Sequence, residues 1–163
     1  MSTITYEAVQ VGIDYADDAV RVGFGEFPNA SGYPTAGLIL SRSTDPAEDV
    51  PGVAGVYTEW NGQENGCYGC IEHVELTRRS IGVTFKASEE SWGVLRLHPG
   101  AAGRGEGDRL TELQITFSLD DATFQELRRA LHELIFINCD CFSLAEQGRA
   151  TRGSTADRPP PHQ

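Results

Sequence analysis

The chain of 163 residues has no apolar run that approaches the ~20 residues needed to cross a bilayer. Its first ten residues, MSTITYEAVQ, contain neither a basic segment nor the apolar core of a signal peptide. We therefore expect a cytoplasmic protein that neither crosses nor binds a membrane. The length is sufficient for one domain with a buried core.

Basic residues are scarce, with 13 Lys and Arg against 24 Asp and Glu, which gives a net charge of −11. Residues 1–60 hold nine acidic residues and two arginines, a net charge of −7. This balance disfavours binding to nucleic acid or to an anionic membrane, because both need cationic contacts. It favours a fast encounter with a basic protein. The alternative is that the acidity only keeps the protein in solution.

The chain has four cysteines, and we expect no disulfide framework in a cytoplasmic protein of this length. Cys67 and Cys70 form a C-x-x-C motif, and Cys139 and Cys141 form C-x-C. Four thiolates can hold tetrahedral zinc, so a zinc-stabilised interaction module is one alternative. Two unrelated pairs of thiols explain the pattern equally well, and we predict no metal and no cofactor.

No catalytic signature stands out along the chain. The glycine-rich segment 103–107 lacks the Lys-Ser/Thr ending of a phosphate-binding loop. A thiol enzyme built on Cys67 and His73 is a further alternative, but spacing alone cannot establish such a pair. We therefore predict a protein that is not an enzyme.

Apolar and polar residues alternate over much of the chain, which is typical of half-buried strands. Strands are predicted over residues 5–13, 19–26, 36–42, 55–60, 70–76, 80–86 and 110–119. A short helix is expected over residues 88–97 and a glycine-rich loop over 98–108.

The best predicted helix spans residues 120–137, with an apolar stripe and with Asp120 or Asp121 as its cap. The stripe consists of Phe124, Leu127, Leu131, Leu134 and Ile135. We predict an α+β fold, a mostly antiparallel sheet of about six or seven strands with this C-terminal helix packed on one face. Residues 1–142 would form the single domain, and residues 143–163 a disordered polar tail.

The segment 55–76 is expected to form a central hairpin, with turns at its two Asn-Gly pairs. Aromatic and acidic side chains gather in it, and aromatic residues flanked by carboxylates suit an interface with a partner that brings Arg and Lys. The alternative is that they are ordinary sheet residues on a solvated face. The candidate binding residues are Tyr57, Glu59, Trp60, Glu64, Tyr68 and Glu72.

Three motifs in order, GLILSRS (37–43), GVYTEWNGQ (55–63) and CYGCIEHVEL (67–76), resemble the Immunity protein 10 family of bacterial polymorphic toxin systems. The segment 117–135, FSLDDATFQELRRALHELI, is similar to that family's C-terminal strand and helix. The chain departs from the family pattern at Cys70, where a second glycine is expected. That departure weakens the case for Cys70 as a required metal ligand.

The resemblance implies a small α+β protein that binds and neutralises a cognate toxin by stoichiometric protein–protein interaction. The acidic balance of the chain fits this task if the toxin is basic, since a steered encounter must outpace damage. The resemblance assigns no binding residues, so the candidates in the 55–76 segment are predicted from residue chemistry alone.

Overall fold

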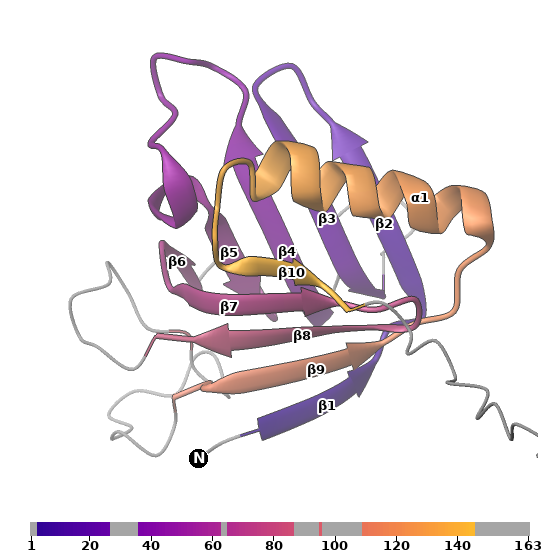
Figure 1. The fold of residues 1–163 in the computed structure, drawn as a ribbon. Coiled ribbons are helices and arrows are strands. Elements are labelled where there is room, and N and C mark those ends of the chain that lie inside the picture. Colours follow the sequence, from indigo (N-terminus) through magenta and orange to yellow (C-terminus); the bar gives the residue numbers. More distant parts are fainter. Residues whose placement is uncertain (1–2, 27–35, 63–64, 87–94, 96–108, 146–163) are drawn as a thin grey trace, which may run out of the picture.

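The computed structural model describes residues 3–26, 36–62, 65–86, 95 and 109–145. Within them the chain forms two five-stranded sheets and one C-terminal helical segment (Figure 1). This arrangement confirms the predicted α+β class and the helix packed against a sheet. The number of strands differs from the prediction, because ten strands are shared between two sheets.

Sheet A has the strand order β1-β9-β8-β7-β10. Its central pairs are antiparallel, whereas each edge strand is parallel to its neighbour. Its strands are β1 (Thr3–Glu7), β7 (Ile71–Leu76), β8 (Ser80–Phe85), β9 (Glu112–Thr116) and β10 (Phe142–Leu144).

Sheet B has the order β2-β3-β4-β5-β6, and every neighbouring pair in it is antiparallel. A single 3-10 turn, η1 (Gly52–Gly55), precedes β5. Its strands are β2 (Gln10–Tyr15), β3 (Ala19–Glu26), β4 (Ala36–Ser43), β5 (Tyr57–Trp60) and β6 (Gly66–Tyr68).

Two predictions are corrected by this topology. The single strand expected over residues 5–13 is two strands, and β1 and β2 belong to different sheets. The hairpin partner of β5 is the short strand β6, whereas the expected partner, β7, lies in sheet A. Alternation shows that a segment is half buried, but it carries no information about which neighbour the segment pairs with.

The helical segment begins with α1 (Asp121–Arg129) and continues as a π-helix, η3 (Ala130–Ile135). The carboxylate of Asp120 accepts a hydrogen bond of 2.7 Å from the backbone N–H of Thr123, so Asp120 is the cap. The backbone N–H of Phe136 donates to the carbonyl of Leu131, the wide spacing of a π turn. No helix among the described residues is long and apolar enough to span a membrane.

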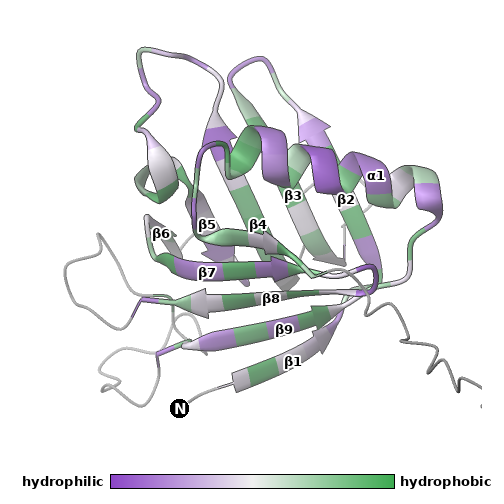
Figure 2. Cartoon of the chain, in the orientation of Figure 1, coloured by the Kyte–Doolittle hydropathy of each residue, from purple (hydrophilic) through white to green (hydrophobic). Residues whose placement is uncertain are grey.

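One hydrophobic core joins the inner faces of both sheets to the helical stripe. Leu127, Leu131 and Ile135 are fully buried in it, and the helical segment packs against β3 and β4. Hydrophobic and hydrophilic residues alternate along most strands in Figure 2, which is the pattern of sheets with one buried face. Each sheet therefore turns one face to this core and the other away from it.

The end of the described chain extends beyond the expected domain boundary. Ser143 and Leu144 belong to β10 and pair with Glu75 and Leu76 of β7. The helix expected over residues 88–97, the loop expected over 98–108 and the tail from residue 146 lie outside the described residues, apart from Leu95.

Candidate functional site

The outer face of sheet B presents two rows of side chains from neighbouring strands. In one row Arg21 pairs with Ser41, Ser41 with Tyr57, and Tyr57 with Tyr68. In the next row Ile39 pairs with Glu59, opposite Gly66 on β6. The two rows point the same way because alternate residues of a strand share a face.

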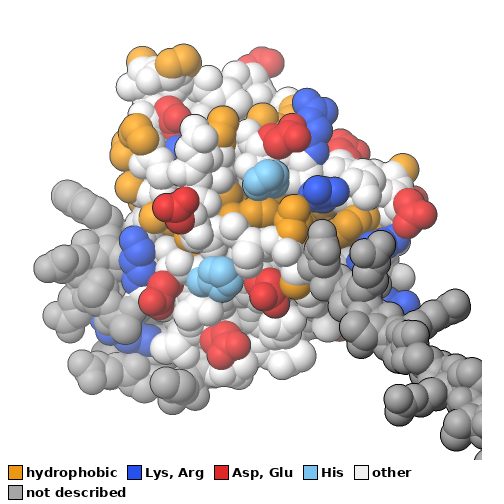
Figure 3. All heavy atoms as spheres, viewed as in Figure 1, with side chains coloured by type: hydrophobic (Ala, Val, Ile, Leu, Met, Phe, Trp, Pro, Cys, Tyr) orange, Lys and Arg blue, Asp and Glu red, His pale blue; other side chains and the backbone are white. Residues whose placement is uncertain are grey.

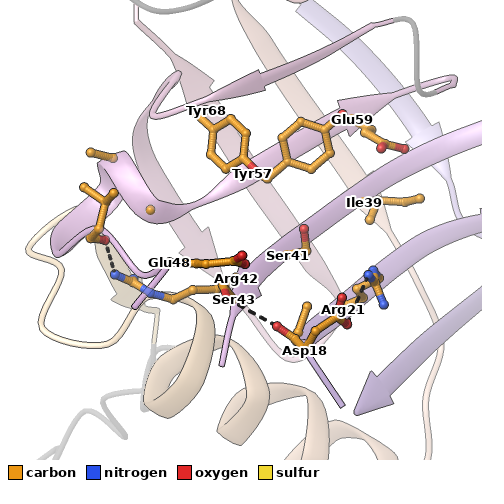
Figure 4. A pocket seen from close by; sticks show the side chains of 14 residues that line it. Asp18, Arg21, Ile39, Ser41, Arg42, Ser43, Glu48, Tyr57, Glu59 and Tyr68 are labelled. Atoms are coloured by element: carbon orange, nitrogen blue, oxygen red, sulfur yellow. Dashed lines mark hydrogen bonds and ion pairs between the residues drawn. The ribbon is translucent and has the colours of Figure 1, made fainter. Parts of the chain in front are cut away.

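These rows form the floor of a hollow of about 370 Å³, which we call the sheet B hollow. Figure 4 shows the two tyrosines at one side, Asp18 and Arg21 at another, and Ser41 between them. Glu48, Val50 and Ala54 add a wall from the segment between β4 and β5. Val50 and Tyr68 are large hydrophobic side chains with more than half of their surface exposed.

Tyr57 stands between Tyr68 and Glu59 in the hollow. Its ring lies 4.8 Å from the ring of Tyr68, centroid to centroid, and Tyr57 stands beside the carboxylate of Glu59. Burial, then the negative charge of Glu59 and hydrogen bonding of the hydroxyl to that carboxylate, raise the pKa of Tyr57 to about 12. The hydroxyl therefore stays protonated at neutral pH and remains a hydrogen-bond donor.

Two arginines near the hollow are already paired. Arg21 lies 3.8 Å from a carboxylate oxygen of Asp14 and 3.8 Å from one of Asp18. Arg42 is buried, and its guanidinium donates to the carboxylate of Asp49 at 2.9 Å. It also donates to the carbonyl oxygens of Val50 at 2.7 Å and Ile135 at 2.9 Å. Arg42 thus ties the wall segment and the end of η3 to β4.

The structure brings together three of the six candidate residues predicted from the sequence. Tyr57, Glu59 and Tyr68 line the sheet B hollow. Glu72 lies on β7 of sheet A and is exposed. Glu64 lies outside the described residues.

The expectation that Trp60 contributes to the same surface is corrected. Its side chain is only 3% exposed and lies on the inner face of sheet B, where its ring contacts the ring of Tyr6 at 5.9 Å. Trp60 follows Glu59 directly, so a strand conformation turns the two side chains to opposite faces.

Several residues of the hollow were not predicted. Arg21 comes from β3, Ile39 and Ser41 come from β4, and Glu48 comes from the loop that follows. The alternation of β3 and β4 shows that Arg21 and Ser41 face away from the core. Only the strand pairing shows that Ser41 stands between Arg21 and Tyr57.

The cysteines form two disulfides between sequence neighbours, Cys67 with Cys70 and Cys139 with Cys141. This corrects the expectation that the cysteines form no disulfide framework. Among the described residues no group of three or more His, Cys, Asp or Glu side chains is arranged to hold a metal ion.

The suggested pair of Cys67 and His73 does not come together. Cys67 is buried in the core on the inner face of sheet B. His73 is exposed on β7 of sheet A, where its Nε2 lies 3.3 Å from the hydroxyl of Ser143.

A second hollow of about 360 Å³ lies between α1 and β10. Figure 3 shows the face that contains it, with hydrophobic side chains gathered in a band below α1. Arg78 lines this hollow and is already engaged, because it donates to the carbonyl of Leu119 and the carboxylate of Asp121 and lies over the ring of Phe124.

A family model described as Immunity protein 10 matches residues 5–97, more than half of the chain. The matched segment includes all of sheet B and every residue that lines the sheet B hollow. Helix α1 and strands β9 and β10 lie beyond it. No curated protein and no solved structure matches the chain.

Proposed function

Because this chain belongs to the Immunity protein 10 family, we propose that it binds and neutralises a cognate toxin of a bacterial polymorphic toxin system. Neutralisation is stoichiometric: the protein occupies a surface that the toxin needs and carries out no reaction of its own. It acts in the cytoplasm, where the toxin would reach its target.

One observation carries the assignment of the binding surface, namely the acidic and aromatic hollow on the outer face of sheet B. Tyr68 is 56% exposed at its rim, and Tyr57 lies beside it. Tyrosine is enriched among the residues that dominate binding energy in protein interfaces, because it buries a large area at little entropic cost. The hollow also lies wholly inside the matched segment, whereas most of the lining of the second hollow does not.

The charge of the chain supports a basic partner. Residues 1–60, which contribute most of sheet B, carry a net charge of −7. Such a field accelerates the encounter with a positively charged toxin and makes the association rate depend on salt.

The experiment is co-expression with the toxin that this proposal expects the neighbouring gene to encode, with bacterial growth as the readout. The unmodified protein is expected to restore growth. The double variant Glu59→Lys/Tyr68→Ala is expected to lose protection while keeping the wild-type circular dichroism spectrum.

The matched control is Glu72→Lys, which makes the same charge change at an exposed site on sheet A. It is expected to protect as well as the wild type. Equal protection by all three proteins removes the sheet B hollow as the binding surface, and absence of protection by the wild type contradicts the proposed function.

A further inference from the structure

Two carboxylates of the sheet B hollow have no cationic partner among the described residues. Arg42 forms an ion pair with Asp49, and Arg21 forms ion pairs with Asp14 and Asp18. Glu48 and Glu59 line the same hollow, and no ion pair within the described part of the chain reaches either of them. As far as the described residues go, the hollow therefore keeps negative charge that no cationic side chain pairs with.

Glu59 is the more constrained of the two. It lies on the outer face of the sheet, yet the residue is only 8% exposed. Tyr57 stands beside it on the same strand face. A carboxylate has two oxygens and about four acceptor sites, so Glu59 can accept further hydrogen bonds from a ligand. A carboxylate with restricted access to water gains most from a donor that also carries positive charge.

The two tyrosine rings of the hollow also favour a positively charged hydrogen-bond donor. Tyr57 and Tyr68 stand next to each other beside Glu59, as Figure 4 shows. A guanidinium group stacks on aromatic rings and donates several hydrogen bonds in one plane, whereas an ammonium group is compact and strongly hydrated. The combination of a carboxylate with adjacent tyrosine rings therefore favours arginine over lysine.

The form of the hollow favours a side chain delivered by a protein. It opens on the broad outer face of a sheet, and exposed Tyr68 and Val50 border it. Its volume is at the low end of the range of about 300–1,000 Å³ that is typical of small-molecule pockets. A single long side chain can enter it while the surrounding partner surface covers Tyr68 and Val50.

We propose that the sheet B hollow receives one arginine side chain of the partner, with its guanidinium hydrogen-bonded to Glu59 and in contact with the ring of Tyr57 or Tyr68. Glu48 adds negative charge from the opposite wall. This inference rests on the proposed function and specifies the chemistry of the residue that the toxin contributes.

The test uses a probe that does not require the toxin. The ¹⁵N-labelled full chain is titrated with Nα-acetyl-arginine methylamide and followed by NMR. The citrulline analogue, which is similar in shape but neutral, serves as the matched control ligand. The arginine probe is expected to shift backbone signals around Ile39, Tyr57 and Glu59 in a saturable way. The citrulline analogue is expected to bind with an affinity at least about tenfold lower.

Two variants locate the effect. Glu59→Gln keeps the shape of the side chain. It is expected to lower the affinity for the arginine probe about tenfold, because a charge-assisted hydrogen bond is lost. Tyr68→Leu changes a side chain that is 56% exposed, and it is expected to weaken binding of the arginine probe about threefold. Glu72→Gln on sheet A is expected to leave the titration unchanged.

Shifts of equal size over both sheets, or equal shifts with the citrulline analogue, overturn the proposal. The outcome is separable from that of the proposed function. Protection from the toxin without localised arginine shifts overturns only the arginine site, whereas localised shifts without protection contradict toxin neutralisation and leave the arginine site standing.

Discussion

The ring of Tyr57 lies directly over Gly66 on the neighbouring strand β6. A Cβ atom placed on Gly66 would collide with the Tyr57 hydroxyl and would come within 2.8 Å of Cζ. Because Gly66 has no side chain, the end of the Tyr57 ring can occupy the space above it, next to Glu59. The contact involves the far end of a side chain, which can swing aside without disturbing the backbone.

The variant Gly66→Ala is expected to displace the Tyr57 ring and separate its hydroxyl from Glu59. We expect a loss of toxin affinity with a change in unfolding free energy below about 1 kcal/mol, because only a side-chain end has to move. Affinity is measured by surface plasmon resonance and stability by urea denaturation.

Gly82→Ala is the matched control, since an added Cβ on that outer-face residue of sheet A would likewise meet a side-chain end, the Oε1 of Gln114 at 2.8 Å. It is expected to keep full affinity. A Gly66→Ala protein that binds as tightly as the wild type would show that the position of Tyr57 is irrelevant to binding.

Stability is expected to fall as the pH rises between about 10 and about 12. The pKa of Tyr57 is raised from 10.0 to about 12 in the folded protein, so above pH 10 the unfolded chain loses this proton first. Fewer protons bound to the unfolded state than to the folded state means that stability decreases with pH in this window. Urea denaturation at several pH values measures the effect.

The variant Tyr57→Phe removes the titrating hydroxyl and is expected to flatten that part of the pH profile. Tyr68→Phe is the matched comparison, because it removes a neighbouring exposed hydroxyl and should leave the slope caused by Tyr57 in place. A tyrosinate absorbance titration in which every tyrosine of the folded protein ionises near pH 10 would contradict the raised pKa.

Arg42 is expected to be among the most important polar residues for stability. Replacing Arg42 by Met leaves the carboxylate of Asp49 and the carbonyls of Val50 and Ile135 without their donor. Loss of a buried charged group from such a network costs about 3 kcal/mol. Urea denaturation measures this cost.

The control is Arg129→Met, which breaks the exposed pair of Arg129 and Glu133. Exposed pairs one helical turn apart contribute about 0.3–0.5 kcal/mol, so this variant should unfold close to the wild type. Similar destabilisation of both variants would mean that the contacts of Arg42 do not hold the wall segment in place.

The four cysteines are expected to be joined as two local pairs in the protein purified without reductant. Peptide mapping should find Cys67 linked to Cys70 and Cys139 linked to Cys141, with no labelling by a thiol reagent before reduction. The zinc alternative makes the opposite prediction: one equivalent of zinc per chain, and four thiols that react after chelation.

Local sequence patterns predicted the elements that depend on local physics. The helix over residues 120–137 followed from its stripe and from Asp120, because a cap and a 3.6-residue period are properties of one segment. The strands β3, β4 and β8 followed from strict alternation. The family was identified from three short motifs and from the segment 117–135. The family match contains the three motifs, whereas the segment 117–135 lies beyond it.

The lining of the sheet B hollow depended on information that no single segment of the sequence holds. Tyr57, Glu59 and Tyr68 were predicted from residue chemistry, but Trp60 beside them was assigned to the wrong face. Its size and aromaticity suit a buried and an exposed site equally well. Arg21 and Ser41 have no local feature that separates them from other polar residues on strands.

The sequence by itself determined the α+β class, the capped C-terminal helix, the acidic balance and the family, because each is encoded in composition, periodicity or a contiguous motif. The tertiary structure alone decided that the strands form two sheets, that Trp60 faces the core, and that Arg21, Ser41 and Glu48 meet the tyrosines in one hollow. Strand pairing brings together residues that are tens of positions apart, and the hydrogen bonds that select each neighbour involve backbone groups common to nearly all residues.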